Sequence, residues 1–149
     1  MALEVRQATI ADIEALVPLF DGYRTFYGFA SDEALARSFL FERFRNLQSI
    51  VFIALIEGHA CGFTQLYPSF SSGRAARTFI LNDLFVSGPA RKRGVGRALL
   101  AAAKNYARAA GAVRLMLSTA TDNTTARSLY EAAGWQRETK FVTYNLPLE

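Results

Sequence analysis

The stretch that most constrains this chain is residues 82–97, Asn-Asp-Leu-Phe-Val-Ser-Gly-Pro-Ala-Arg-Lys-Arg-Gly-Val-Gly-Arg. It joins a predicted buried strand, residues 78–86, to a predicted Ala- and Leu-rich helix, residues 94–110. Glycines at 94 and 96 let the backbone approach a ligand closely, and the first N–H groups of a helix lie unpaired at the positive end of its dipole. This unit therefore predicts an anion site that suits a pyrophosphate.

Basic side chains gather on the same unit. The chain has 17 basic and 13 acidic residues, but residues 84–121 contain no Asp or Glu and seven basic residues: Arg91, Lys92, Arg93, Arg97, Lys104, Arg108 and Arg114. The rest of the chain contains 10 basic residues and all 13 acidic ones. An acidic body with one basic segment indicates a localised anionic partner. The charges cluster at one helix start with few aromatic residues between them, which favours a compact polyphosphate over nucleic acid.

The spacing of the glycines excludes two common nucleotide sites. A Rossmann turn needs a third glycine at position 99, where Leu99 stands, and no Gly-x4-Gly-Lys-Ser/Thr loop is present. A single cysteine and a single histidine exclude an internal disulfide and a Cys/His zinc site. NAD, ATP and metal are therefore not expected.

The length of 149 residues and a hydrophobic content of 51% predict one folded domain over residues 1–149. No run of about 20 apolar residues is present, and the N-terminus has no basic segment followed by an apolar run. We therefore expect a cytoplasmic protein without a membrane partner.

Local patterns predict alternating strands and helices. Thr9 to Asp12 resembles a capping box at the start of a helix that ends near Tyr23, and Ser31 is expected to cap a second helix. The other predicted elements are strands at 3–8, 49–57, 60–67, 78–86, 112–118 and 141–146 and helices at 94–110 and from Asn123 to Gly134. This order predicts a mixed α/β sheet with helices on both faces.

Two motifs carry a family resemblance. The pattern Arg91-x-x-Gly94-x-Gly96 after a strand, followed by Asn123-x6-Tyr130 on a later helix, resembles the GNAT superfamily of acetyl-CoA-dependent N-acetyltransferases. The resemblance implies the GNAT acyltransferase fold, in which a splayed strand pair holds the cofactor. The cofactor-binding residues it implies are Leu84, Phe85, Val86, Arg91, Lys92, Arg93, Gly94, Val95, Gly96, Arg97, Asn123 and Tyr130.

The strand Leu81-Asn-Asp-Leu-Phe-Val86 is most similar to diamine and polyamine acetyltransferases, which carry Glu where Asn82 stands. An amide cannot act as a base, so this difference falls at a chemically important position. Asp83 is retained as the acidic side chain of the strand. It is a candidate base or anchor for a second cationic amine, and a purely structural carboxylate is the alternative. Strand alternation places it opposite Asn82 and Leu84 unless the strand bulges.

The resemblance implies further catalytic roles. The Leu84 N–H is the candidate donor to the acetyl oxygen, and Tyr130 is the candidate acid for the leaving thiolate. Asn123 and Tyr130 are about two helical turns apart, so one helix can present both to the cofactor. His59 is expected at the surface and Cys61 in the packing, without a covalent acetyl-cysteine.

Aromatic side chains mark a candidate acceptor pocket. Tyr23, Tyr27 and Tyr67 lie in aromatic-rich segments that flank the acceptor site in the family, and together with Asp83 they suit a cationic amine. An ordinary core or a homodimer contact fits the same aromatic residues equally well.

These observations predict an N-acetyltransferase that moves an acetyl group from acetyl-CoA to a primary amine of a small molecule, by direct attack in a ternary complex. CoA is the second product. A protein lysine or N-terminus as acceptor and a non-catalytic acyl-CoA-binding module are the alternatives.

Overall fold

The structure is a computed structural model that describes residues 2–149. Contacts within the chain divide it into two units, Met1–Ser118 and Thr119–Glu149, and each is described by itself. The single domain expected from the sequence stays a prediction. No helix in the described part of the chain is both long and apolar enough to cross a membrane.

The first unit is built on a five-stranded sheet in the order β1-β2-β3-β4-β5. Neighbouring strands are antiparallel, except that β4 and β5 are parallel. The strands are β1 (Leu3–Gln7), β2 (Ile50–Ile56), β3 (His59–Ser71), β4 (Ala76–Val86) and β5 (Leu115–Met116). The helices of this unit are η1 (Ile10–Asp12), α1 (Ile13–Phe26), α2 (Glu33–Arg45), η2 (Gly88–Ala90) and α3 (Val95–Ala109).

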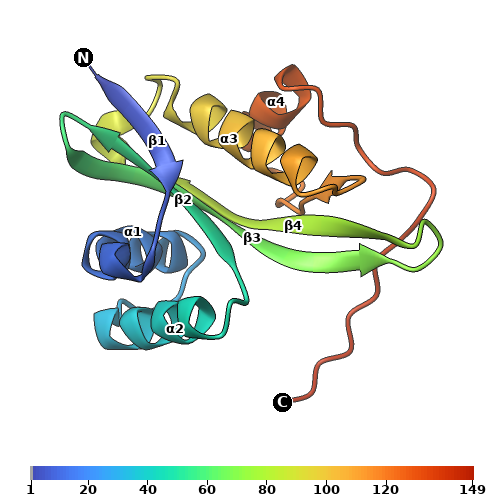
Figure 1. The fold of residues 1–149 in the computed structure, drawn as a ribbon, viewed down its shortest axis with the longest axis horizontal. Helices are drawn as coiled ribbons and strands as arrows, with labels where there is room; N and C mark the ends of the chain where they lie inside the picture. Colours follow the sequence, from blue (N-terminus) through green and yellow to red (C-terminus); the bar gives the residue numbers. More distant parts are fainter. Residues whose placement is uncertain (1) are drawn as a thin grey trace. The chain divides into compact units, whose positions relative to one another are not determined.

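Helices cover both faces of this sheet. Helices α1 and α2 lie on one face and α3 on the other (Figure 1). Val51 and Ile53 of β2 belong to the apolar cluster under α1 and α2, whereas Phe52 and Ala54 belong to the cluster under α3. A strand that is buried on both faces must be apolar at successive positions, which explains the continuous apolar run of β2. The predicted mixed α/β sheet with helices on both faces is confirmed.

The predicted capping box opens the first helical segment. The Ala11 N–H donates to Thr9 Oγ1 over 3.2 Å, and the Thr9 N–H donates to Asp12 Oδ2 over 2.8 Å. Arg6 donates to both oxygens of Asp12, and it is the main reason why the pKa of that carboxyl lies below its ordinary value. The helical segment continues through η1 and α1 to Phe26, three residues past the predicted end.

The prediction that Ser31 caps the second helix is wrong. Asp32 occupies the cap, and its Oδ1 accepts from the Leu35 N–H over 3.0 Å. The Ser31 hydroxyl donates instead to the buried Asp21 Oδ2 over 2.7 Å, and the Asp32 N–H donates to Asp21 Oδ1 over 2.8 Å. The cap shifted by one residue because a buried carboxylate on α1 needs donors, which the α1–α2 connection supplies.

The second unit contains α4 (Thr124–Ala132), which begins after Asn123 and ends before Gly134 as predicted. The strand expected at 141–146 does not form, and Phe141, Val142, Tyr144 and Leu146 are exposed. A strand needs a neighbour to pair its backbone groups, and the described part of this unit has none. The strand expected at 112–118 is likewise reduced to β5, because its pairing with β4 covers only two residue pairs.

Candidate active site

The outer edge of β4 carries peptide groups that point away from β3, among which the Val86 carbonyl accepts from Arg91 Nε. The Ser87 N–H donates to the Cys61 carbonyl over 2.8 Å, in register with the β3–β4 ladder. Only every second pair of an antiparallel ladder exchanges hydrogen bonds. Since Ser87 and Cys61 form such a pair, the peptide groups of Val86 and Leu84 point away from β3. Both residues are among those that the family resemblance implies for cofactor binding, Leu84 through its N–H.

No strand covers that edge beyond the first half of β4. Within residues 2–149, β5 pairs with β4 only at Phe79 and Ile80. The two strands therefore part before Leu84, as the expected splayed pair requires. An extended ligand with amide groups can pair with such an edge in the way that a further strand would.

A bulge at Asn82 interrupts the regular pairing of β4 with β3. Asp83 is opposite Gln65 and Leu81 is opposite Leu66, so Asn82 is the extra residue of β4. Asp83 is 2% exposed and bonds to Gln65 on the face covered by α1, whereas Leu84 packs into the cluster under α3. The bulge thus adds twist where the edge opens.

The basic turn leads from this edge into α3. Gly94 has a φ of +81° and precedes the helix without a side-chain cap, and the first helical bond runs from the Ala98 N–H to the Gly94 carbonyl. The N–H groups of the first turn therefore have no acceptor within the helix. A positive φ is readily adopted by glycine, which explains the residue at this position. Five residues of this turn and first helical turn are exposed: Arg91, Lys92, Arg93, Gly94 and Arg97.

Two residues predicted to bind the cofactor, Val95 and Arg91, also stabilise the structure around this turn. Val95 is 1% exposed and packs in the cluster under α3, which anchors the helix start. Arg91 donates from Nε to the Val86 carbonyl over 3.0 Å, and its guanidinium carbon lies 5.9 Å from the centre of the Phe85 ring. Arg91 therefore ties the basic turn to the open edge of β4. Gly96 lies half-buried in the first turn of α3.

Asp83 is the centre of a polar cluster, which we define as Tyr23, Gln65, Tyr67, Asn82 and Asp83; of these, Gln65 and Asp83 are buried. Gln65 Nε2 donates to Asp83 Oδ2 over 2.6 Å, and Asn82 Nδ2 donates to Asp83 Oδ1 over 2.8 Å. Burial raises the pKa of Asp83, and the hydrogen bonds from Asn82 and Gln65 lower it only in part. No salt bridge reaches this carboxylate from the described residues.

Two of the predicted substrate tyrosines join this cluster. The Tyr23 hydroxyl donates to the Asn82 carbonyl over 3.1 Å. Burial raises the pKa of both Tyr23 and Tyr67, and the charge of Asp83 adds to the effect. Tyr27 is 48% exposed and its ring centre lies 5.0 Å from that of Tyr23. The structure therefore brings together all four residues that the sequence predicts for the acceptor.

Asn123 and Tyr130 belong to the second unit. Asn123 Oδ1 accepts from the Ala126 N–H over 3.2 Å, so this side chain caps α4. The Tyr130 ring centre lies 6.0 Å from that of Trp135. The roles of Asn123 toward the cofactor and of Tyr130 as an acid stay predictions.

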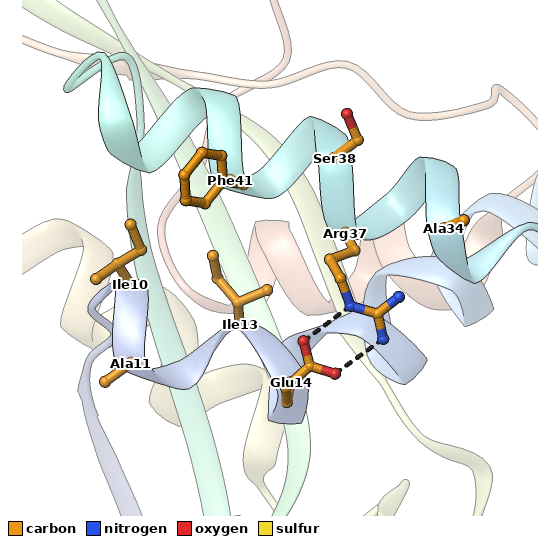
Figure 2. A pocket seen from close by; sticks show the side chains of 8 residues that line it. All are labelled: Ile10, Ala11, Ile13, Glu14, Ala34, Arg37, Ser38 and Phe41. Atoms are coloured by element: carbon orange, nitrogen blue, oxygen red, sulfur yellow. Dashed lines mark hydrogen bonds and ion pairs between the residues drawn. The ribbon is translucent and has the colours of Figure 1, made fainter.

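His59 and Cys61 lie in the environments that the sequence predicts. His59 is exposed, and Cys61 is buried with its pKa raised chiefly by burial, which fits packing and disfavours a thiolate. The described residues contain no cluster of side chains able to hold a metal ion. A groove of about 560 Å³ lies between α1 and α2, but Glu14 and Arg37 in it satisfy each other through two 2.8 Å bonds (Figure 2). None of the predicted site residues lines it.

Gln65 is the cluster residue that the sequence did not single out. It is 0% exposed and stands in the otherwise apolar stretch from Cys61 to Leu66, apart from Thr64. A glutamine in a buried strand requires a partner, and that was the available signal. The partner, 18 residues away, could not be named without the register of β3 and β4.

Comparison with known proteins identifies the family. Residues 16–135 match the model of the Acetyltransferase (GNAT) family. The chain is 49% identical over 144 residues to the uncharacterised N-acetyltransferase YhfO of Bacillus subtilis, with 97% of each chain covered. The crystal structure of a probable acetyltransferase is 41% identical, has a TM-score of 0.94 and covers 98% of each chain.

A more distant structure has the same fold. It is an aminoglycoside N-acetyltransferase in complex with CoA, 21% identical, with a TM-score of 0.82 and coverage of 97% of this chain and 95% of the other. The match over residues 16–135 and the identity to YhfO over almost the whole chain make the assignment. This chain belongs to the GNAT family of acetyltransferases.

Proposed function

We propose that this enzyme transfers the acetyl group of acetyl-CoA to a primary amine of a small molecule, by direct attack of the amine in a ternary complex. The observation that carries the proposal is the open edge of β4, where the peptide groups of Leu84 and Val86 lead directly into the basic turn before α3. The buried carboxylate of Asp83 lies on the same strand, one residue from Leu84.

The residues present suit acetyl-CoA. The pantetheine amides can pair with the backbone of Val86, beside Phe85, which leaves the Leu84 N–H for the acetyl oxygen. The pyrophosphate can accept from the first N–H groups of α3, with charge from Arg91, Lys92, Arg93 and Arg97. The bound thioester supplies the activated acetyl group.

The chemistry needs three contributions from the chain. The amine nitrogen forms a bond to the acetyl carbon, the carbon–sulfur bond breaks, and one amine proton leaves to Asp83. The Leu84 N–H stabilises charge on the acetyl oxygen, which is worth about 3–4 kcal/mol where such donors have been removed. Tyr130 returns a proton to the thiolate sulfur, since a phenol pKa near 10 is close to that of a thiol.

Two features support a small cationic acceptor. Asp83 has neutral donors and no described ion-pair partner, and Tyr23, Tyr27 and Tyr67 offer aromatic faces to a cation. One neighbour of the same fold is an aminoglycoside N-acetyltransferase, which also takes an amine.

The test is a thiol-release screen of the purified protein with acetyl-CoA across polyamines, amino acids, aminoglycosides and lysine peptides. Release with small amines only supports the proposal. Preference for peptides would establish a protein acceptor, and CoA binding without release under any condition would establish a binding module.

A further inference from the structure

Among the described residues, the Gln65 side-chain amide forms a hydrogen bond through its nitrogen and none through its oxygen. Its Nε2 donates to Asp83 Oδ2 over 2.6 Å, whereas Oε1 is buried and has no hydrogen-bond partner among the described residues. The residue is 0% exposed. A buried carbonyl oxygen without a donor is costly, and such atoms in a candidate site point to a missing donor.

The orientation of this amide follows from its neighbours. Both oxygens of Asp83 receive side-chain N–H groups, one from Gln65 and one from Asn82. An ionised carboxylate only accepts hydrogen bonds, so the NH₂ end of Gln65 must face it and Oε1 must face away. The unpartnered atom is therefore fixed by the carboxylate.

We propose that Gln65 determines specificity for primary amines, by accepting one N–H of the acceptor nitrogen at Oε1 while Asp83 accepts the other. This inference rests on the proposed acetyl transfer to an amine. A neutral primary amine that attacks with its lone pair has two N–H groups left, one for each of these two acceptors. A secondary amine has one N–H left, so it cannot use both Asp83 and Gln65.

An amine can reach Gln65 only by moving past the side chains that surround it. Tyr23 and Tyr67 are half-buried and Asn82 is exposed, whereas Oε1 itself is closed to solvent. One of these side chains must turn to admit the amine. Arg43 of α2 faces this region with a positive charge, which partly offsets the rise in the pKa of Tyr67.

The experiment compares kcat/KM for the best primary amine of the screen with that for its N-methyl analogue. Gln65→Met removes donor and acceptor at nearly constant length. We expect a loss of about tenfold with the primary amine, a clearly smaller loss with the secondary amine, and a KM for acetyl-CoA within twofold of the parent value. Gln65→Asn withdraws the amide by one methylene and should change the ratio in the same direction, even if Gln65→Met fails to fold.

Thr64→Val is the matched control. Thr64 is also 0% exposed on β3, but its hydroxyl donates to the main-chain carbonyl of Asp83 over 2.8 Å and does not bond to the carboxylate. This variant should leave the ratio between the two amines unchanged. Equal losses on both amines in the Gln65 variants, or no loss, would overturn the proposal, whereas absence of thiol release with every amine would instead remove the proposed function.

Discussion

The side-chain amide of Gln65 and the carboxylate of Asp83 lie directly opposite each other on β3 and β4 and are joined by a 2.6 Å hydrogen bond. Both residues are almost completely buried. Burial raises the pKa of this carboxyl, and its neutral donors lower it only in part. This pair places a buried carboxylate on β4 next to Leu84, whose peptide groups point away from β3.

Replacing Asp83 by Asn should reduce turnover by about 10²–10⁴-fold, because an amide cannot take the amine proton. The parent enzyme should lose kcat/KM as the pH falls through the raised pKa of Asp83, since the base must be ionised, and this limb should be absent in the variant. Steady-state thiol release between pH 5 and 9 measures it, with thermal unfolding as the control for folding. An identical pH profile in both proteins would remove Asp83 as the base.

Tyr130→Phe should reduce turnover strongly while acetyl-CoA affinity changes by no more than a few-fold, because only the proton for the thiolate is lost. Tyr144→Phe is the matched control, since Tyr144 is 90% exposed in the same unit. Single-turnover kinetics and isothermal titration with acetyl-CoA separate the two effects. Unchanged turnover in Tyr130→Phe would exclude it from the mechanism.

Arg93→Glu should weaken CoA binding by about tenfold or more, because it reverses a charge beside the first turn of α3. Arg108→Glu makes the same change in net charge near the last turn of the helix, about 20 Å away by helical rise, and should change the Kd by less than twofold. The Kd of each variant for CoA, measured at two salt concentrations, distinguishes a local anion site from general electrostatic attraction. Equal effects of both substitutions would indicate general electrostatic attraction without a site.

Asp21→Asn should lower the free energy of unfolding at pH 7 by about 1–2 kcal/mol, because the Ser31 hydroxyl and the Asp32 N–H bond to a buried carboxylate. The pKa of Asp21 is lowered, first by the Ser31 hydroxyl, from its ordinary value of 3.8. A depressed pKa means that the charged form stabilises the fold above that ordinary value, and that this stabilisation is lost as the pH falls through the lowered pKa. Urea unfolding at pH 7 and pH 3 measures this effect. The difference in the free energy of unfolding between the parent protein and Asp21→Asn should be smaller at pH 3 than at pH 7.

Several features of this protein were predictable because they depend on neighbouring residues. The capping box of Thr9 and Asp12, the glycine turn at Gly94 and the cap of α4 by Asn123 each require only a few consecutive residues. The charge asymmetry of residues 84–121 is likewise visible in the sequence. The family resemblance, the alternation of strands and helices along the chain and the candidate cofactor turn followed from such features.

What required the tertiary structure depends on pairing between distant residues. The shift of the cap from Ser31 to Asp32 follows from the needs of Asp21 on α1, and the short β5 and the unformed strand at 141–146 follow from which partners are present. The bulge at Asn82 and the contact of Gln65 with Asp83 depend on the register of β3 and β4. A strand sequence specifies which side chains alternate, but only its partner decides which backbone groups stay unpaired and which buried polar atoms meet. The open edge of β4 and the Gln65–Asp83 pair are therefore properties of the folded sheet.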